Sequence, residues 1–143
     1  MTKSEEICKE LGNLYFFKEL VKSNLLYITD KKEEKELADV LMRVDDYILT
    51  IQIKEKATNT SNNIENWLNN KVYKVAKNQI KISVQEIIKK INFKEDENAD
   101  ILDNIDKCTI VPIIIFDIGN ENIKYQRSYE SKSSNLKINI FNI

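Results

Sequence analysis

Three polar residues in the first half of the chain, Asp39, Gln52 and Lys54, have the types that phosphate chemistry needs. A carboxylate and an amide oxygen can hold a hard cation, and an ammonium can stabilise charge that develops on a phosphate. The chain contains no histidine, which excludes a Ser-His-Asp triad, a Cys-His pair and a histidine metal site. General-base chemistry would therefore come from carboxylates, lysines or metal-bound water.

The segments that carry these three residues are predicted to form a β-hairpin. Residues 36–44 and 47–56 are rich in β-branched and large apolar side chains, which favour strands. Asp45 and Asp46 between them fit a two-residue turn, although Asp-Gly would be the stronger signal. The sequence therefore predicts a strand, a tight turn and a second strand.

The register of this hairpin follows from the turn. If Asp45 and Asp46 are its two loop residues, Asp39 lies directly opposite Gln52, with Cβ atoms roughly 5 Å apart. Lys54 lies two residues beyond Gln52 and shares its face of the sheet. The three side chains are therefore expected to converge on one spot.

The surroundings of the three side chains are apolar, since they alternate with aliphatic residues along both strands. Charges in such a place lose hydration energy unless they are paired or bind something. A Mg²⁺ site needs only one or two carboxylates plus water and phosphate. The alternative is a cross-strand Asp–Lys pair on a solvated face, and a one-residue bulge would separate the three residues altogether.

The elements that must position this hairpin follow from hydrophobic periodicity. Two helices and six strands are expected in this order: helix 4–22, strands 24–28, 36–44 and 47–56, helix 64–91, and strands 108–118, 122–129 and 136–141. This order predicts a single α/β domain over residues 1–143, a mixed β-sheet flanked by helices. Pro112 within the strand 108–118 indicates a bulge or an edge.

Composition limits the classes of function. The chain has 143 residues, 42% apolar, with a net charge of −1, which argues against a binder that relies on bulk positive charge. Two glycines cannot form a glycine-rich phosphate loop. Cys8 and Cys108 lie far apart and are expected to be reduced thiols. With no apolar signal segment at its start, the chain is expected in the cytoplasm.

The segment KELADVLMRVDDYILTIQIKEK resembles the core of the PD-(D/E)XK nucleases, which have the restriction-endonuclease-like fold. That superfamily places an Asp on one strand and an acid-x-Lys motif on the next. Asp39 matches the first position, and Gln52-Ile53-Lys54 matches the motif with Gln in place of the acid. The resemblance covers roughly residues 10–118, includes WLNNKVYKVAKNQIKISVQEI, and agrees with the order helix, three strands, helix, strand.

The resemblance implies a Mg²⁺-dependent endonuclease-like domain that hydrolyses DNA phosphodiester bonds. Asp39 and Gln52 would hold the metal, and Lys54 would orient or activate water. Because Gln52 is neutral, the alternative is a catalytically inactive module of the same fold that serves binding or assembly, including an immunity-type protein. The resemblance leaves a homodimer open, and it suggests that the chain is truncated at the C-terminus.

Two residues of the helix 64–91 are candidates for substrate contact. Gln79 falls on the predicted inner stripe, where it would contact the site or the substrate backbone; the alternative is a core amide that bonds to the main chain. Lys71 could meet a phosphate as part of a basic flank with three other lysines, Lys74, Lys77 and Lys81. The alternative for this flank is a solvated helix face.

Three further residues have weaker claims. Glu10 lies on the inner side of the first predicted helix, from which an acid often joins the metal site in the superfamily; the alternative is a charge at the helix edge. Glu36 points away from Asp39 by strand alternation and is a fallback acid only. Trp67 could stack on a base, but a tryptophan in such a stripe is expected in the core.

Overall fold

The computed structural model describes residues 2–15, 21–57, 63–89, 100–119, 122–133 and 135–143. Its strands are β1 (Val21–Ile28), β2 (Glu34–Val44), β3 (Tyr47–Glu55), β4 (Thr109–Asp117), β5 (Ser128–Ser131) and β6 (Leu136–Asn142). They form one six-stranded sheet in the order β1-β2-β3-β4-β6-β5. The predicted α/β class with a mixed sheet is confirmed.

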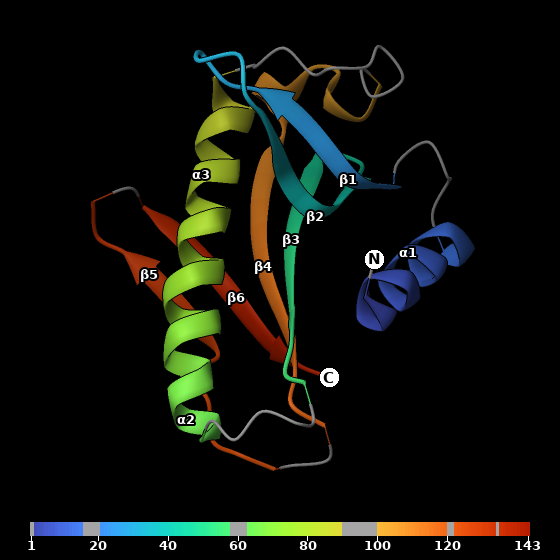
Figure 1. Ribbon diagram of the computed structural model, residues 1–143. Coiled ribbons are helices and arrows are strands. Elements are labelled where there is room, and N and C mark those ends of the chain that lie inside the picture. The colour runs from blue at the N-terminus through green and yellow to red at the C-terminus, as the bar shows by residue number, and fades with distance from the viewer. Residues whose placement is uncertain (1, 16–20, 58–62, 90–99, 120–121, 134) are drawn as a thin grey trace.

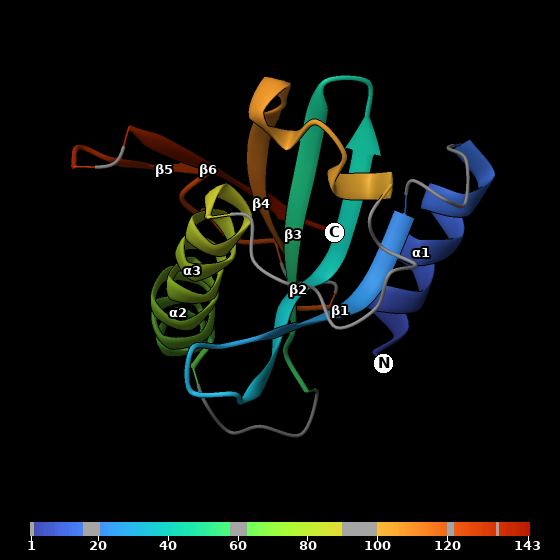
Figure 2. The ribbon, with the colours of Figure 1, turned by 90° about the horizontal axis from the view of Figure 1, so that it is seen from above.

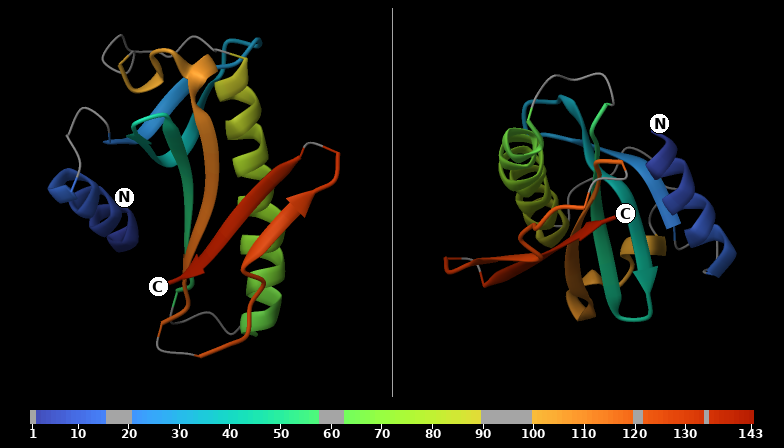
Figure 3. Two further views of the ribbon diagram at one scale, coloured as in Figure 1. Left: turned by 180° about the vertical axis from the view of Figure 1, so that it is seen from behind. Right: turned by 90° about the horizontal axis from the view of Figure 1, so that it is seen from below.

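Helices cover both faces of this sheet (Figures 1 and 2). Helix α1 (Lys3–Tyr15) lies against the face of β1, β2 and β3, and α3 packs on β2, β3 and β4 from the other side. Figure 3 shows the β5–β6 hairpin at the edge of the sheet opposite α1. Val21 belongs to β1, so the predicted extension of the first helix to residue 22 is wrong, and residues 16–20 lie outside the described part.

The β2–β3 hairpin has the predicted turn and register. Val44 pairs with Tyr47 across Asp45 and Asp46, and the pairing continues to Val40 opposite Ile51. Asp45 adopts a positive φ of 50°, which Asp tolerates better than most residues. The pairing ends one residue before Asp39 and Gln52, so their placement opposite each other stays a prediction.

One continuous helical segment follows, in three parts: α2 (Ile64–Trp67), the π-helix η2 (Leu68–Ala76) and α3 (Lys77–Ile88). Asn63 caps its start, because its Oδ1 accepts a hydrogen bond of 2.9 Å from the N–H of Glu65. The predicted single helix is confirmed over residues 64–88. Residues 90–91 lie outside the described part.

The π-helix changes which residues of this helix face the sheet. Its i→i+5 hydrogen bonds give wider turns than an α-helix. Core positions accordingly recur every four residues, at Val72, Ala76, Ile80 and Val84. Val75 and Ile82, which lie four residues before and three residues after Gln79 and share its face at an α-helical period, are exposed, so that period does not describe the inner face of this helix.

Strand β4 runs parallel to β3 along its whole length, close to the predicted bounds 108–118. Pro112 pairs with Thr50 of β3, but β4 pairs with β6 only over Ile113–Phe116. At Pro112 the strand therefore has a neighbour on one side only, and a residue without an N–H donor is tolerated there. This is the edge-like position that the proline indicated.

The C-terminal strands form an antiparallel hairpin whose β6 lies parallel to β4. The predicted strand 136–141 is confirmed, whereas β5 begins only at Ser128 rather than at residue 122. Trp67 is 7% exposed and its ring centroid lies 6.5 Å from that of Phe116, which confirms its core position. In the described ranges, no helix has the length and apolar character needed to cross a membrane.

Candidate active site

The strands β2 and β3 stop pairing after Val40 and Ile51. At this point the Oδ2 atom of Asp39 accepts a hydrogen bond from the backbone N–H of Ile53. The carboxylate thus occupies the place of a strand partner where the two strands separate. We call this position, formed by Asp39, Gln52 and Lys54, the fork.

Asp39 is 7% exposed, and its burial raises the pKa of the carboxyl above the ordinary value. The hydrogen bond from Ile53 and the charge of Lys54 act in the opposite direction, while Glu5 raises the pKa further. Asp39 and Lys54, which were predicted to converge, are therefore close enough for the charge of Lys54 to act on the Asp39 carboxyl. Since none of the ion pairs among the described residues joins them, a direct cross-strand salt bridge does not form.

Gln52 is 3% exposed, and its Oε1 atom has no hydrogen-bond partner within the described structure. The hydroxyl of Thr50, two residues earlier on β3, also lacks a partner there. A buried oxygen without a donor costs free energy, and native proteins rarely leave one unexplained. A buried amide oxygen without a donor is the kind of group that a hard cation can use.

Glu36, the fallback acid, belongs to the same cluster, although strand alternation predicted that it points away from Asp39. Leu25 pairs with Ala38 whereas Leu26 pairs with Glu36, so β2 carries one extra residue at Leu37. This bulge breaks the strand alternation from which the direction of the Glu36 side chain was predicted. Burial raises the pKa of Glu36, and the charge of Asp39 raises it further, so the two carboxyls are close enough to interact.

The acid that α1 contributes is Glu5, which the sequence analysis missed, and not Glu10. Glu5 raises the pKa of both Asp39 and Glu36. Glu10, by contrast, is exposed. The signal that could have drawn attention to this turn is the capping pattern Thr2-x-x-Glu5.

This first turn of α1 is fixed in place by two sets of hydrogen bonds. Thr2 Oγ1 accepts from the N–H of Glu5 at 3.3 Å, and Glu5 Oε2 accepts from the N–H of Thr2 at 2.8 Å. The Oε1 atom of Glu55, at the end of β3, accepts from the N–H of Ser4 at 2.6 Å. The hydrogen bonds from Ser4 are the main cause that lowers the pKa of Glu55. The helix start is therefore held at the end of β3.

On the other face, α3 holds the bulge of β2. The hydroxyl of Ser83 donates to the carbonyl oxygen of Leu37, and the carbonyl of Gln79 lies 2.9 Å away as a second acceptor. Ser83 is 2% exposed, so this bond crosses a buried helix–sheet interface. It fixes the strand segment that leads into Asp39.

The candidate substrate-contacting residues on the helix are both exposed. The prediction that Gln79 faces the sheet is wrong, because the π-helix turns Ile80 inward instead. Lys71 lies on the exposed surface of η2, as the basic flank requires, but its contact with a phosphate stays a prediction. Two other lysines of the flank contact an aromatic ring: Lys77 and Lys81 lie 4.1 and 4.9 Å from the ring centroid of Tyr129.

The donor set at the fork fits a hard cation better than a soft one. Asp39 and Gln52 offer oxygen atoms, which suit Mg²⁺ or Mn²⁺ and give no reason to expect Zn²⁺. In the part of the chain that is described, no group of three or more Asp, Glu, Cys or His side chains could hold a metal ion. Water or a phosphate would therefore have to complete the coordination shell.

Comparison of the chain with protein-family models, with curated proteins and with solved structures gave no match. The residues at the fork are therefore the basis for a functional assignment.

Proposed function

We propose that this protein is a metal-dependent nuclease with a restriction-endonuclease-like core that hydrolyses DNA phosphodiester bonds. The observation that carries the proposal is the fork itself, where the buried Asp39 carboxylate accepts a hydrogen bond from Ile53, the residue between the orphaned Gln52 and Lys54. The order helix, three strands, helix, strand supports it, since the PD-(D/E)XK resemblance implies the same order.

Each residue of the fork has a separate role. A bound Mg²⁺ or Mn²⁺ would polarise the phosphate and lower the pKa of its water. Asp39 supplies the anionic ligand and Gln52 a neutral one. Lys54 directs its ammonium toward the phosphate and stabilises the negative charge that develops there.

The substrate would approach from the side of Lys54 and Glu36. Asp39 and Gln52 are buried, whereas Lys54 is half-buried and Glu36 is exposed. Partial burial raises the pKa of Glu36, and the charge of Asp39 adds to this rise. Glu36 is therefore the acid best placed to strengthen the site when a cation arrives.

The basic flank of the helix supplies the expected affinity for the DNA backbone. Lys71 and Lys74 are exposed on η2, where they can contact phosphates without sequence preference. Binding through such contacts weakens steeply as salt concentration rises. The net charge of −1 confines this attraction to a local surface.

The proposal is tested by cleavage of linear and supercoiled DNA with Mg²⁺ or Mn²⁺. The wild type should cut, and Asp39→Ala or Lys54→Ala should lower the rate by at least about a hundredfold. Lys137→Ala is the matched control, since this exposed lysine pairs with Glu130 on the far hairpin. Absence of metal-dependent cleavage by a folded wild type would exclude the nuclease.

A second candidate function is DNA binding or assembly without catalysis. Two observations favour it: the neutral Gln52 at the acid position, and the lack of a three-ligand acid, Cys or His group in the described structure. This module would bind DNA with a strong salt dependence and would not cut it. Lys71→Ala would weaken that binding, while Asp39→Ala would leave it unchanged.

A further inference from the structure

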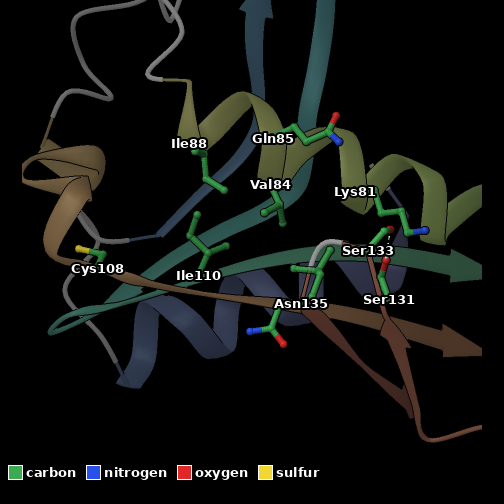
Figure 4. Close-up of a pocket in the computed structure, with 10 residues that line it drawn as sticks. Lys81, Val84, Gln85, Ile88, Cys108, Ile110, Ser131, Ser133 and Asn135 are labelled. Atoms are coloured by element: carbon green, nitrogen blue, oxygen red, sulfur yellow. Dashed lines mark hydrogen bonds between the residues drawn. The ribbon is translucent and has the colours of Figure 1, made fainter.

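A cavity of about 490 Å³ lies between α3, the start of β4 and the β5–β6 turn (Figure 4). Its lining shares no residue with the fork. Its volume falls in the range that small-molecule sites occupy. The cavity is therefore a separate place in which to look for a ligand.

One end of this cavity is polar and positively charged. Figure 4 shows Lys81 of α3 next to Ser131 and Ser133 of the hairpin. The two serine hydroxyls lie 3.1 Å apart, and Ser131 is 8% exposed. Lys81 lies over the ring of Tyr129 and forms no ion pair with any described residue.

The other end is apolar. Val84 and Ile88 of α3 face Ile110 of β4 across the cavity (Figure 4). Leu136 of β6 is a further apolar residue of the lining. Ile88 is 64% exposed, the largest exposed fraction of any large apolar side chain in the described structure. Apolar surface of this kind gains free energy when a ligand covers it.

We propose that this cavity binds a small amphipathic anion, a carboxylate or phosphate monoester attached to an apolar chain. The anionic head accepts hydrogen bonds from Lys81, Ser131 and Ser133. The apolar chain covers Val84 and Ile110. Since none of the lining residues in the described structure carries a carboxylate, nothing in the lining repels the head.

The ligand class is tested by titration calorimetry of the full chain with octanoate and with octyl phosphate. Two controls each keep one half of these probes: acetate has the anionic head without the apolar chain, and 1-octanol has the apolar chain without the charge. Octanoate or octyl phosphate should bind at least about tenfold more tightly than acetate and 1-octanol. Which of the two binds more tightly identifies the head group. If acetate or 1-octanol binds as well as both anions, the proposal is overturned.

Matched lysine variants test the polar end. Lys81→Gln should weaken octanoate or octyl phosphate binding by about tenfold, because it removes the charge at the head. Lys74→Gln is the control, since Lys74 is exposed on the same helical segment and does not line the cavity. Equal affinity in these two variants, with far-ultraviolet circular dichroism unchanged, would contradict the proposal.

Cys108 offers a readout that does not depend on a substitution. Its thiol lies at the apolar end of the cavity (Figure 4), so the bound chain should slow its alkylation by N-ethylmaleimide. Cys8, which packs against the core beneath α1, serves as the internal reference by peptide mapping. Selective protection of Cys108 supports the site; equal rates with and without octanoate and octyl phosphate contradict it. Asp39→Ala should retain the protection, because the fork is separate.

Discussion

The carboxylate of Asp39 in β2 accepts a hydrogen bond from the backbone N–H of Ile53 in β3, where the two strands cease to pair. A side chain here replaces the strand partner that β3 loses when β2 turns away. The bond holds a buried carboxylate at the backbone of Ile53, the neighbour of Gln52 in the chain, and within the field of Lys54. The fork is thus built by a local break in regular β-structure.

The raised pKa of Asp39 makes its effect on stability depend on pH. The folded protein keeps the carboxyl proton of Asp39 to a higher pH than the unfolded chain does. The stability that the protonated carboxyl contributes is therefore fully present below the ordinary pKa of 3.8. It is lost as the pH rises through the folded pKa. Asp39→Asn keeps an acceptor for Ile53 and removes the charge, so its stability relative to the wild type should rise between about pH 3 and pH 7.

Urea unfolding over this pH range measures the difference. The exposed turn residue provides the control variant Asp46→Asn, which should follow the wild-type curve. If Asp39→Asn and Asp46→Asn change in parallel with pH, the burial of an unneutralised carboxylate at the fork is refuted.

Gln52 should cost stability in the metal-free protein, because its buried Oε1 lacks a hydrogen-bond donor. Replacing it by the similarly sized leucine should raise the free energy of unfolding by about 1–2 kcal/mol. Chemical denaturation without divalent cations measures this effect. A loss of stability in Gln52→Leu would mean that the amide oxygen is satisfied after all.

Ser83 should stabilise the bulge that precedes Asp39. Ser83→Ala leaves the buried carbonyl of Leu37 without its donor and should lower the free energy of unfolding by about 1–2 kcal/mol. The half-buried Ser23 of β1 gives the comparison variant Ser23→Ala, for which a change within about 0.5 kcal/mol is expected. Equal effects of the two variants would show that the Ser83 bond does not hold the bulge.

Glu55 should hold the first turn of α1 on the sheet. Its carboxylate accepts a hydrogen bond from the N–H of Ser4. Because the pKa of Glu55 is lowered in the folded protein, the stability that the ionised carboxylate contributes is present above the ordinary pKa of 4.5 and is lost as the pH falls through the folded pKa. Glu55→Gln should destabilise α1 by about 1 kcal/mol near neutral pH. Amide hydrogen exchange in α1 measures it, with Glu10→Gln as the unaffected control; unchanged exchange in Glu55→Gln would refute the cap.

The hairpin that carries the fork could be predicted from the sequence because its signals are local. Asp45 and Asp46 set a turn, and the turn sets the register of the strands that it joins. The same reasoning found the continuous helix and the buried strand β4, whose periodicity and apolar run are strong. The predicted register holds as far as Val40 and Ile51, where the pairing ends before Asp39 and Gln52.

The parts that could not be predicted depend on interactions between distant segments. The bulge at Leu37 needs the partner strand β1, and it decides where Glu36 lies. The π-helix rotates the helix surface, so Gln79 is exposed although an α-helical period places it inside. Glu5 joins the cluster only because α1 docks on the end of β3 through Glu55. No local sequence pattern predicts these contacts.

Binding of Mn²⁺ to the full chain, followed by electron paramagnetic resonance, tests most directly whether the fork holds a divalent metal ion. The wild type should bind one ion; Asp39→Ala should abolish this binding and Gln52→Glu should strengthen it by at least about tenfold, because a charged ligand replaces a neutral one. Wild type, Asp39→Ala and Gln52→Glu with the same Mn²⁺ affinity would contradict the account.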